Sequence, residues 1–159
     1  MKLTNYEIGD IAEEFGSDLL VLQRDGKRHL SGYSNNGTII IEDLELSNNF
    51  EVKFDIDLSD FDTIISLQSD DENSVEMSLK NNSIKFGNTK KQYDKTSWEG
   101  GLSINSIKIL IKENTSKVFI NGKFFATSRI NGNSNYNRLI IRKIKKDDAL
   151  FSLSIKNLK

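Results

Sequence analysis

The sequence predicts an all-β protein, a two-sheet antiparallel β-sandwich, and three observations support this prediction. First, polar and apolar residues alternate with a period of two along several runs, as in strands with one buried and one solvated face. Second, clusters of Asn, Asp, Gly and Ser separate these runs about every 8 to 12 residues, a spacing typical of sandwiches and barrels. Third, Asn121-Gly122 joins two apolar runs, which is the strongest short signal for a β-hairpin.

The alternation also predicts which side chains are buried. In the run NFEVKFDIDL, apolar residues occupy every second position and charged residues the positions between them. The residues predicted to face the core in this run and in later runs are Phe50, Val52, Phe54, Ile56, Leu58, Val75, Met77, Leu79, Ile84, Phe86, Ile107, Ile109, Ile111, Phe151, Leu153 and Ile155. We expect about a dozen strands and little helix, since only residues 5–16 could be helical and two glycines interrupt them.

The hairpin prediction can be made residue by residue. A type I′ turn needs a positive φ at both central residues, and Asn followed by Gly meets this need. Residues 118–121 and 122–126 should therefore form one antiparallel hairpin, which joins the preceding strand in a three-stranded meander. Phe124 and Phe125 are adjacent, so a regular strand would point one of them inward and the other outward.

Composition limits the functions open to the chain. Its 159 residues are treated as one domain, in which residues 1–16 are the part that the pattern defines least. The net charge of −1 and the lack of a basic stripe give no attraction to nucleic acid. No segment has the apolar length of a membrane span, and the N-terminus lacks a signal-peptide core. The absence of Cys and the single His exclude thiolate nucleophiles and multi-His metal sites.

The order of these features resembles the concanavalin A-like jelly-roll superfamily and, within it, the laminin-G-like domains. Four segments carry the resemblance, which spans residues 17–158: DGKRHLSGYSNNGTIIIEDLELSNNFEVKFDI, NSVEMSLKNNSIKF, NSIKILIKENTSKVFINGKFFATS and DDALFSLSIKNL. Members often carry a Trp shortly before the strand that leads into the NGK hairpin, whereas here Gly100-Gly101 and Ser103 separate Trp98 from that strand. The resemblance implies a jelly-roll fold and favours an extracellular or cell-envelope location.

The superfamily includes lectins, carbohydrate-binding modules, glycoside hydrolases and adhesion domains, so the fold alone does not choose a function. A glycan is the leading ligand class, because sugars are bound by aromatic faces together with planar polar side chains. Two loops contain such residues. The candidate ligand-binding residues are Tyr93, Asp94, Trp98 and Glu99 in the first loop, and Asn131, Asn133 and Tyr136 in the second.

Calcium is the one metal that the sequence suggests, although no cofactor is required. Asp70, Asp71 and Asn73 place hard oxygen ligands in one turn, and such ligands suit Ca²⁺. The run lacks the ordered spacing of dedicated calcium loops, so a plain solvated turn is the alternative.

Catalysis is the least favoured interpretation. Glu51, Asp55 and Asp57 share one strand face, but their spacing does not match the paired carboxylates of jelly-roll glucanases, and the surroundings of His29 do not suggest a nucleophile elbow. We therefore expect a non-catalytic recognition module that binds carbohydrate. The alternatives are a structural or adhesion domain that binds protein within a larger envelope assembly and, less favoured, a glycoside hydrolase; the sequence predicts no oligomeric state.

Overall fold

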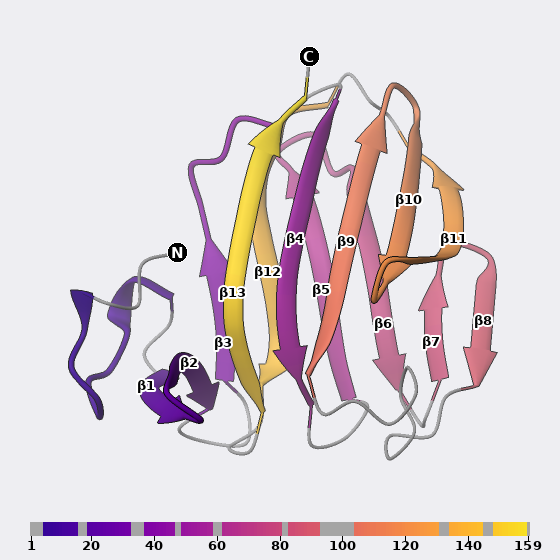
Figure 1. Cartoon of the computed structure of the whole chain (residues 1–159). Coiled ribbons are helices and arrows are strands. Elements are labelled where there is room, and N and C mark those ends of the chain that lie inside the picture. Colours follow the sequence, from indigo (N-terminus) through magenta and orange to yellow (C-terminus); the bar gives the residue numbers. More distant parts are fainter. Residues whose placement is uncertain are drawn as a thin grey trace.

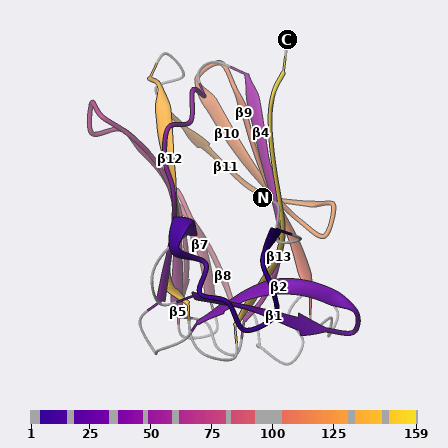
Figure 2. The ribbon, with the colours of Figure 1, turned by 90° about the vertical axis from the view of Figure 1, so that its left-hand side faces the viewer.

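The computed structural model describes residues 5–15, 19–32, 37–46, 49–58, 62–80, 83–92, 104–130, 134–144 and 148–158. Within these ranges the chain forms two antiparallel β-sheets that lie face to face as two layers (Figure 1). Figure 2 shows the two layers from the side, with the hairpin β1–β2 across their lower end. The predicted all-β sandwich is confirmed.

The first sheet contains seven of the described strands and forms the front layer in Figure 1. Its spatial order is β1 (Leu19–Arg24), β2 (Lys27–Gly32), β13 (Ala149–Asn157), β4 (Phe50–Asp57), β9 (Asn105–Lys112), β10 (Thr115–Ile120) and β11 (Lys123–Arg129). The last three strands follow one another in sequence and in space, which confirms the predicted meander.

The second sheet contains six of the described strands and forms the rear layer. Its spatial order is β3 (Gly37–Ile41), β12 (Tyr136–Ile144), β5 (Asp62–Ser69), β6 (Ser74–Lys80), β7 (Ser83–Phe86) and β8 (Thr89–Gln92). Because β12 lies between β3 and β5, the sheet combines strands from distant parts of the sequence.

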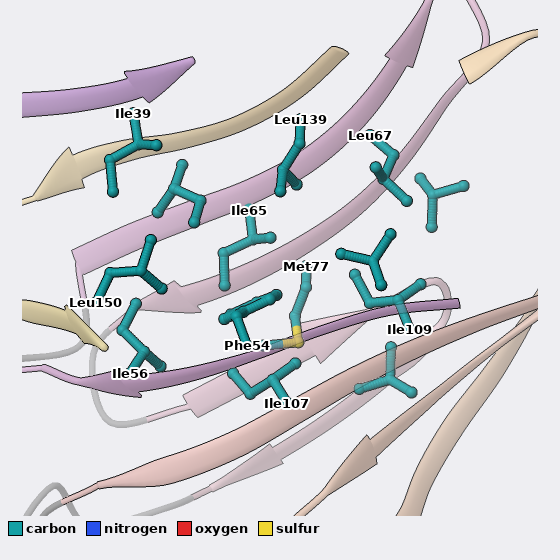
Figure 3. Packing of buried hydrophobic residues seen from close by; sticks show 14 of the residues in the cluster. Ile39, Phe54, Ile56, Ile65, Leu67, Met77, Ile107, Ile109, Leu139 and Leu150 are labelled. Atoms are coloured by element: carbon teal, nitrogen blue, oxygen red, sulfur yellow. The ribbon is translucent and has the colours of Figure 1, made fainter. Parts of the chain in front are cut away.

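The core lies between the two sheets and is built from the alternating apolar residues of both. Phe54 and Ile107 from the seven-stranded sheet meet Ile65 and Met77 from the six-stranded sheet, and all four are fully buried (Figure 3). The predicted inward residues of β4, β6, β7 and β9 are confirmed as buried. Alternation identifies them because each strand has only one face toward the other sheet.

The Asn-Gly hairpin also forms as predicted. Asn121 and Gly122 have φ values of 51° and 81°, so both central residues of the turn are in the left-handed region. Farther along, the pairing of Val118 with Ala126 is followed by that of Phe119 with Phe124, which leaves Phe125 as the extra residue of a bulge. Phe125 is buried, whereas Phe124 is 55% exposed, so the two rings do point in opposite directions.

The N-terminal segment contains a short 3-10 helix, η2 (Glu13–Phe15), and a β-bridge between Ile11 and Leu20, in line with the expectation of little helix. One local feature differs from the sequence prediction. In β13 a shift in register between Leu150 and Ser152 turns Phe151 away from the core, and its ring packs against His29 at a centroid distance of 5.1 Å. Leu153 and Ile155 do pack against the core, although they are only partly buried. No helix among the described residues is long and apolar enough to cross a membrane.

Candidate functional site

The two loops that the sequence singles out for sugar binding leave opposite ends of the sandwich. Gln92, where β8 ends, lies in one row with Ser83, Lys80 and Asp62, at the beginning of β5. Tyr136, where β12 begins, pairs instead with Ser69 at the end of β5. The chain therefore leaves β8 and enters β12 at opposite ends of the six-stranded sheet.

Most of the predicted ligand residues lie outside the described residues. These are Tyr93, Asp94, Trp98, Glu99, Asn131 and Asn133. Tyr136 is described, and it is fully buried with its ring 5.9 Å from that of Phe50. Its aromatic face is therefore part of the core and is not available to a sugar, which corrects the expectation for this residue.

The predicted calcium turn between β5 and β6 contacts the segment before β12. The Ser134 hydroxyl donates a hydrogen bond of 2.9 Å to Asp71 and accepts one of 2.8 Å from the Asn73 amide. Ser69 donates to the other oxygen of Asp71. These two hydroxyl donors, Ser69 first, lower the pKa of Asp71 below its usual value. The predicted calcium turn and the segment before β12, which the sequence analysis considered as separate sites, thus form one hydrogen-bond network.

Asp70 continues this network on the other side of the turn. Its two carboxylate oxygens accept hydrogen bonds of 2.8 Å from Arg138 and 2.8 Å from Asn137. The adjacent hollow of about 420 Å³ is called the rim hollow, and its lining consists of Glu42, Asp43, Leu44, Glu45, Asp70, Asn135, Asn137 and Arg138. Asn135 is also engaged, since its side-chain oxygen accepts a 3.1 Å hydrogen bond from the Leu46 amide. Several polar groups of the rim hollow therefore already serve to hold the fold together.

A second hollow lies where the six-stranded sheet meets the end of β11. We call it the edge pocket; it has a volume of about 370 Å³ and is lined by Ser74, Val75, Glu76, Ser78, Lys85, Phe86, Gly87, Ser116, Ser128, Arg129 and Ile130. The edge pocket exists because β7 is shorter than its neighbour β6. β7 pairs with β6 only from Met77 to Lys80, and the chain then turns at Gly87. The first residues of β6 therefore have no β7 residue beside them, and the edge pocket lies next to them. The end of β11 lines the other side of this pocket.

The wall that β11 contributes is held firmly in place. The Ser116 hydroxyl donates a 3.1 Å hydrogen bond to the Ser128 carbonyl, and Thr127 donates one of 3.0 Å to the Ser116 carbonyl. Gly87 has a φ of 58°, and a Cβ there would lie 2.9 Å from the Cβ of Ser128. Glycine is thus required at this turn both by its backbone conformation and by the close approach of β11.

The edge pocket also carries charges that the fold does not use. Glu76 and Lys85 are exposed, and the buried neighbours on either side of each show that both point to the outer face of the six-stranded sheet. Among the described residues, neither side chain forms an ion pair or a hydrogen bond. Ser74 and Ser78 add hydroxyl groups on the same face of β6. The edge pocket therefore combines unengaged charges and hydroxyls with the partly buried apolar side chain of Ile130.

Sequence reasoning did not find the edge pocket as a site. The alternation in SVEMSLK does separate Ser74, Glu76 and Ser78 from the core residues, so the outward set could be read from the sequence. The contribution of Ser116 and Ser128 could not, because these residues belong to the other sheet. Their place beside Gly87 depends on how the two sheets stack.

The three carboxylates of β4 considered for hydrolysis lie on the outer face of the seven-stranded sheet and have structural partners. Asp57 forms an ion pair with Arg24, and Asp55 accepts a 3.0 Å hydrogen bond from Ser152. Glu51 lies 3.6 Å from the Lys156 amine. The alternation predicts that these residues lie on the outer strand face, and the structure adds the ion pairs and the hydrogen bond that engage them there.

His29 is a buried residue of β2 beside the ion pair of Arg24 and Asp57. Burial and, secondarily, the charge of Arg24 lower the pKa of His29. Its Nδ1 atom is buried and has no hydrogen-bond partner in the part of the chain that the structure describes. The residue is thus a packed neutral imidazole under Phe151, with no nucleophile that it could activate in its described contacts.

Comparison with known proteins extends the fold description. No protein-family model matches the sequence, and no curated protein sequence matches it. Among solved structures, the chain is similar to galectin LEC-6 from Caenorhabditis elegans, with a TM-score of 0.55, 13% identity and coverage of 77% of this chain and 96% of that one.

Two further structures give the same result. A Bacillus subtilis protein of unknown function with a galectin-like fold has a TM-score of 0.58 and 8% identity, over 88% of this chain and 86% of that one. Domains LG4-5 of the mouse laminin alpha1 chain have a TM-score of 0.58 and 10% identity, over 86% of this chain and 45% of that one. At these identities the likeness concerns the fold, which is a concanavalin A-like β-sandwich of the galectin and laminin-G type.

Proposed function

We propose that this protein is a non-catalytic carbohydrate-recognition module and that the edge pocket is its binding site. The observation that carries the proposal is the pocket of about 370 Å³ whose outward charged groups, Glu76 and Lys85, have no partner among the described residues. A ligand gains most from polar groups that the protein does not already satisfy, because no internal hydrogen bond must be broken to bind it. The lectin-like fold of its structural neighbours supports this choice of ligand class.

The chemistry of the lining suits a sugar. Glu76 can accept hydrogen bonds from a pair of hydroxyl groups, while Lys85 and the hydroxyls of Ser74 and Ser78 can donate to ring or hydroxyl oxygens. Ile130, which is only partly buried, supplies an apolar surface for the C–H groups of the ring. The hydrogen bonds around Ser116 and Ser128 hold one wall of the pocket rigid, which lowers the entropy cost of binding.

The rim hollow is the less favourable of the two hollows for this role. Both oxygens of Asp70 are engaged by Arg138 and Asn137, and the side-chain oxygen of Asn135 is engaged by the Leu46 amide. A sugar there would have to compete with contacts that join the β5–β6 turn to β12. We therefore assign the rim network to stability and the edge pocket to recognition.

A glycan array with neutral and acidic oligosaccharides tests the proposal, using the wild-type protein, Ser74→Trp and Ser154→Trp. Ser74 is exposed at the mouth of the pocket, and an indole there would obstruct it. Ser154 is likewise an exposed strand residue, on the seven-stranded sheet, and serves as the matched control. We expect a glycan signal that Ser74→Trp abolishes and Ser154→Trp retains. No signal with any glycan, or a signal that survives Ser74→Trp, would reject the proposed site.

A structural or adhesion role is the second candidate, and the exposed ring of Phe124 favours it. Phe124 is 55% exposed and contacts Phe119 edge-to-face at a centroid distance of 5.9 Å on the outer face of the seven-stranded sheet. Single exposed aromatic residues are common, so this feature weighs less than the edge pocket. Sedimentation of the wild-type protein and of Phe124→Ser, without sugar, would reveal self-association through this ring.

A further inference from the structure

Two lysines lie opposite each other beside the edge pocket, and neither forms an ion pair within the described part of the chain. Lys85 of β7 pairs with Lys90 of β8, and both are exposed. The inward positions of β7 are Ile84 and Phe86, which are buried, so Lys85 and its partner Lys90 both point to the outer face of the sheet. Like charges at directly opposed positions of an antiparallel pair destabilise it.

The neighbouring strands do not neutralise this pair. On its other side Lys85 faces Ser78 of β6, which carries no charge. Lys80 also lies on this face, two rows from that of Lys85. In the described part of the chain, no carboxylate comes within ion-pair distance of Lys85 or Lys90. Lys80 lies directly opposite Asp62 of β5, so Lys85 and Lys90 are the two cations of this face that have no directly opposed carboxylate.

Protection of the sheet edge accounts for only part of this pattern. β8 is the edge strand of the six-stranded sheet, and lysines on an edge strand discourage pairing with another chain. Lys91, the other lysine of β8, is placed differently, since its amine lies 5.1 Å from the centre of the Phe125 ring. Lys85, however, lies on β7, which has neighbours on both sides, so edge protection does not explain a lysine there opposite Lys90.

We propose, on the premise that the edge pocket binds a glycan, that this glycan is acidic, and that Lys85 and Lys90 together bind its carboxylate or sulfate group. The anion removes the repulsion between the two lysines and forms charge-assisted hydrogen bonds with them. Glu76, diagonally across β6 from Lys85, accepts hydrogen bonds from the hydroxyls of the same sugar and disfavours a second anion close by. The site thus selects an oligosaccharide that combines one acidic group with free hydroxyls.

The experiment compares matched ligands on matched variants by calorimetry. The ligands are an oligogalacturonate, the same oligosaccharide with its carboxylates methyl-esterified, and a sulfated galactan oligosaccharide. The variants are Lys85→Gln, Lys90→Gln, the charge-retaining Lys85→Arg and Lys90→Arg, and Lys112→Gln as a control. Lys112 is an exposed strand lysine of the seven-stranded sheet.

We expect an acidic oligosaccharide to bind at least about tenfold more tightly than the neutral ester, and each lysine-to-glutamine change to remove about tenfold of that affinity. The arginine variants and Lys112→Gln should retain binding, and added salt should weaken it. Preference for the galacturonate identifies a carboxylate as the bound group, and preference for the galactan identifies a sulfate. Lys90→Gln should also keep or raise the melting temperature, because it removes a like-charge pair; a purely structural lysine would lower it.

Two results would overturn the inference in distinguishable ways. If the neutral ester binds as tightly as the acid and neither glutamine variant changes this, the acidic-glycan inference fails while carbohydrate recognition stands. If Lys112→Gln lowers the affinity for the acidic oligosaccharide as much as Lys85→Gln does, the attraction is a general charge effect and the assigned lysines are wrong. If no oligosaccharide binds here or on the array, the proposed function fails and the inference fails with it.

Discussion

The hydroxyl of Ser134 donates a hydrogen bond of 2.9 Å to the carboxylate of Asp71, which lies 63 residues earlier in the chain. Ser134 is 2% exposed and also accepts a 2.8 Å hydrogen bond from Asn73. Through this one side chain the segment before β12 is joined to the turn between β5 and β6. The contact connects two surface segments whose sequences suggest binding and shows that both have a structural task.

Ser134→Ala should destabilise the protein, because it leaves Asn73 and Asp71 without a shared partner. We expect the free energy of unfolding to fall by about 1 kcal/mol. Urea unfolding followed by fluorescence measures this. Ser154→Ala, an exposed serine on β13, is the control and should change stability by much less. Equal effects of the two variants would show that the Ser134 network contributes little.

Calcium should leave the melting temperature unchanged, although the sequence suggested Asp70, Asp71 and Asn73 as ligands. A Ca²⁺ ion at this turn would have to displace Arg138 and Asn137 from Asp70, and Ser134 from Asp71. Thermal unfolding in excess calcium, in excess magnesium and with a chelator tests this expectation. A rise that is specific to calcium and is lost in Asp71→Asn would restore the calcium site.

Gly87→Ala should destabilise the protein more than Gly26→Ala does. Both glycines have a positive φ, and a side chain in that conformation costs about 1–2 kcal/mol. A Cβ added at Gly26 would have no atom within 4 Å, whereas one added at Gly87 would lie 2.9 Å from the Cβ of Ser128. Denaturant unfolding of both variants isolates the effect of this close approach.

The double variant Gly87→Ala with Ser128→Gly completes that comparison. Removing the Ser128 side chain should recover the part of the loss that comes from the contact, but not the part that comes from φ. If the stability loss of the double variant equals the sum of the losses of the two single variants, the Ser128 side chain does not contact the turn at Gly87 in solution.

Stability should fall as the pH drops below about 6.5, in part because of His29. Burial and Arg24 lower the pKa of His29 in the folded protein, so the unfolded chain takes up a proton at a higher pH than the folded chain does. The contribution is therefore complete above the unfolded pKa and is lost as the pH falls from there toward the folded pKa.

His29→Gln should show a smaller loss of stability between neutral pH and pH about 5.5, a range above the ordinary pKa of carboxyl groups. Urea unfolding at a series of pH values measures the slopes. Arg24 and Asp57, the charged groups that act on His29, remain in the variant, so the difference in slope reports on the imidazole. Parallel curves for the two proteins would contradict this assignment.

The sequence by itself determined most of the strands, most of their inward faces and the Asn-Gly turn, but it did not indicate β8 (Thr89–Gln92). These features are local, because alternation along β4 or β6 reports only on which face of one strand meets apolar surroundings. The outward set Ser74, Glu76 and Ser78 follows from the same pattern. The alternation did not predict that Phe151 points away from the core, because the register shift in β13 depends on the pairing with β4 and not on the residues of β13.

Only the tertiary structure decided which of these faces and turns meet. The approach of Ser128 to Gly87, which shapes the edge pocket, joins strands from different sheets. The pairing of Lys85 with Lys90 requires the register of β7 on β8, and the contact of Ser134 with Asp71 requires β12 to lie beside β5. Periodicity carries no information on such distant contacts, because they depend on the order and stacking of the strands. The candidate site is formed by these contacts.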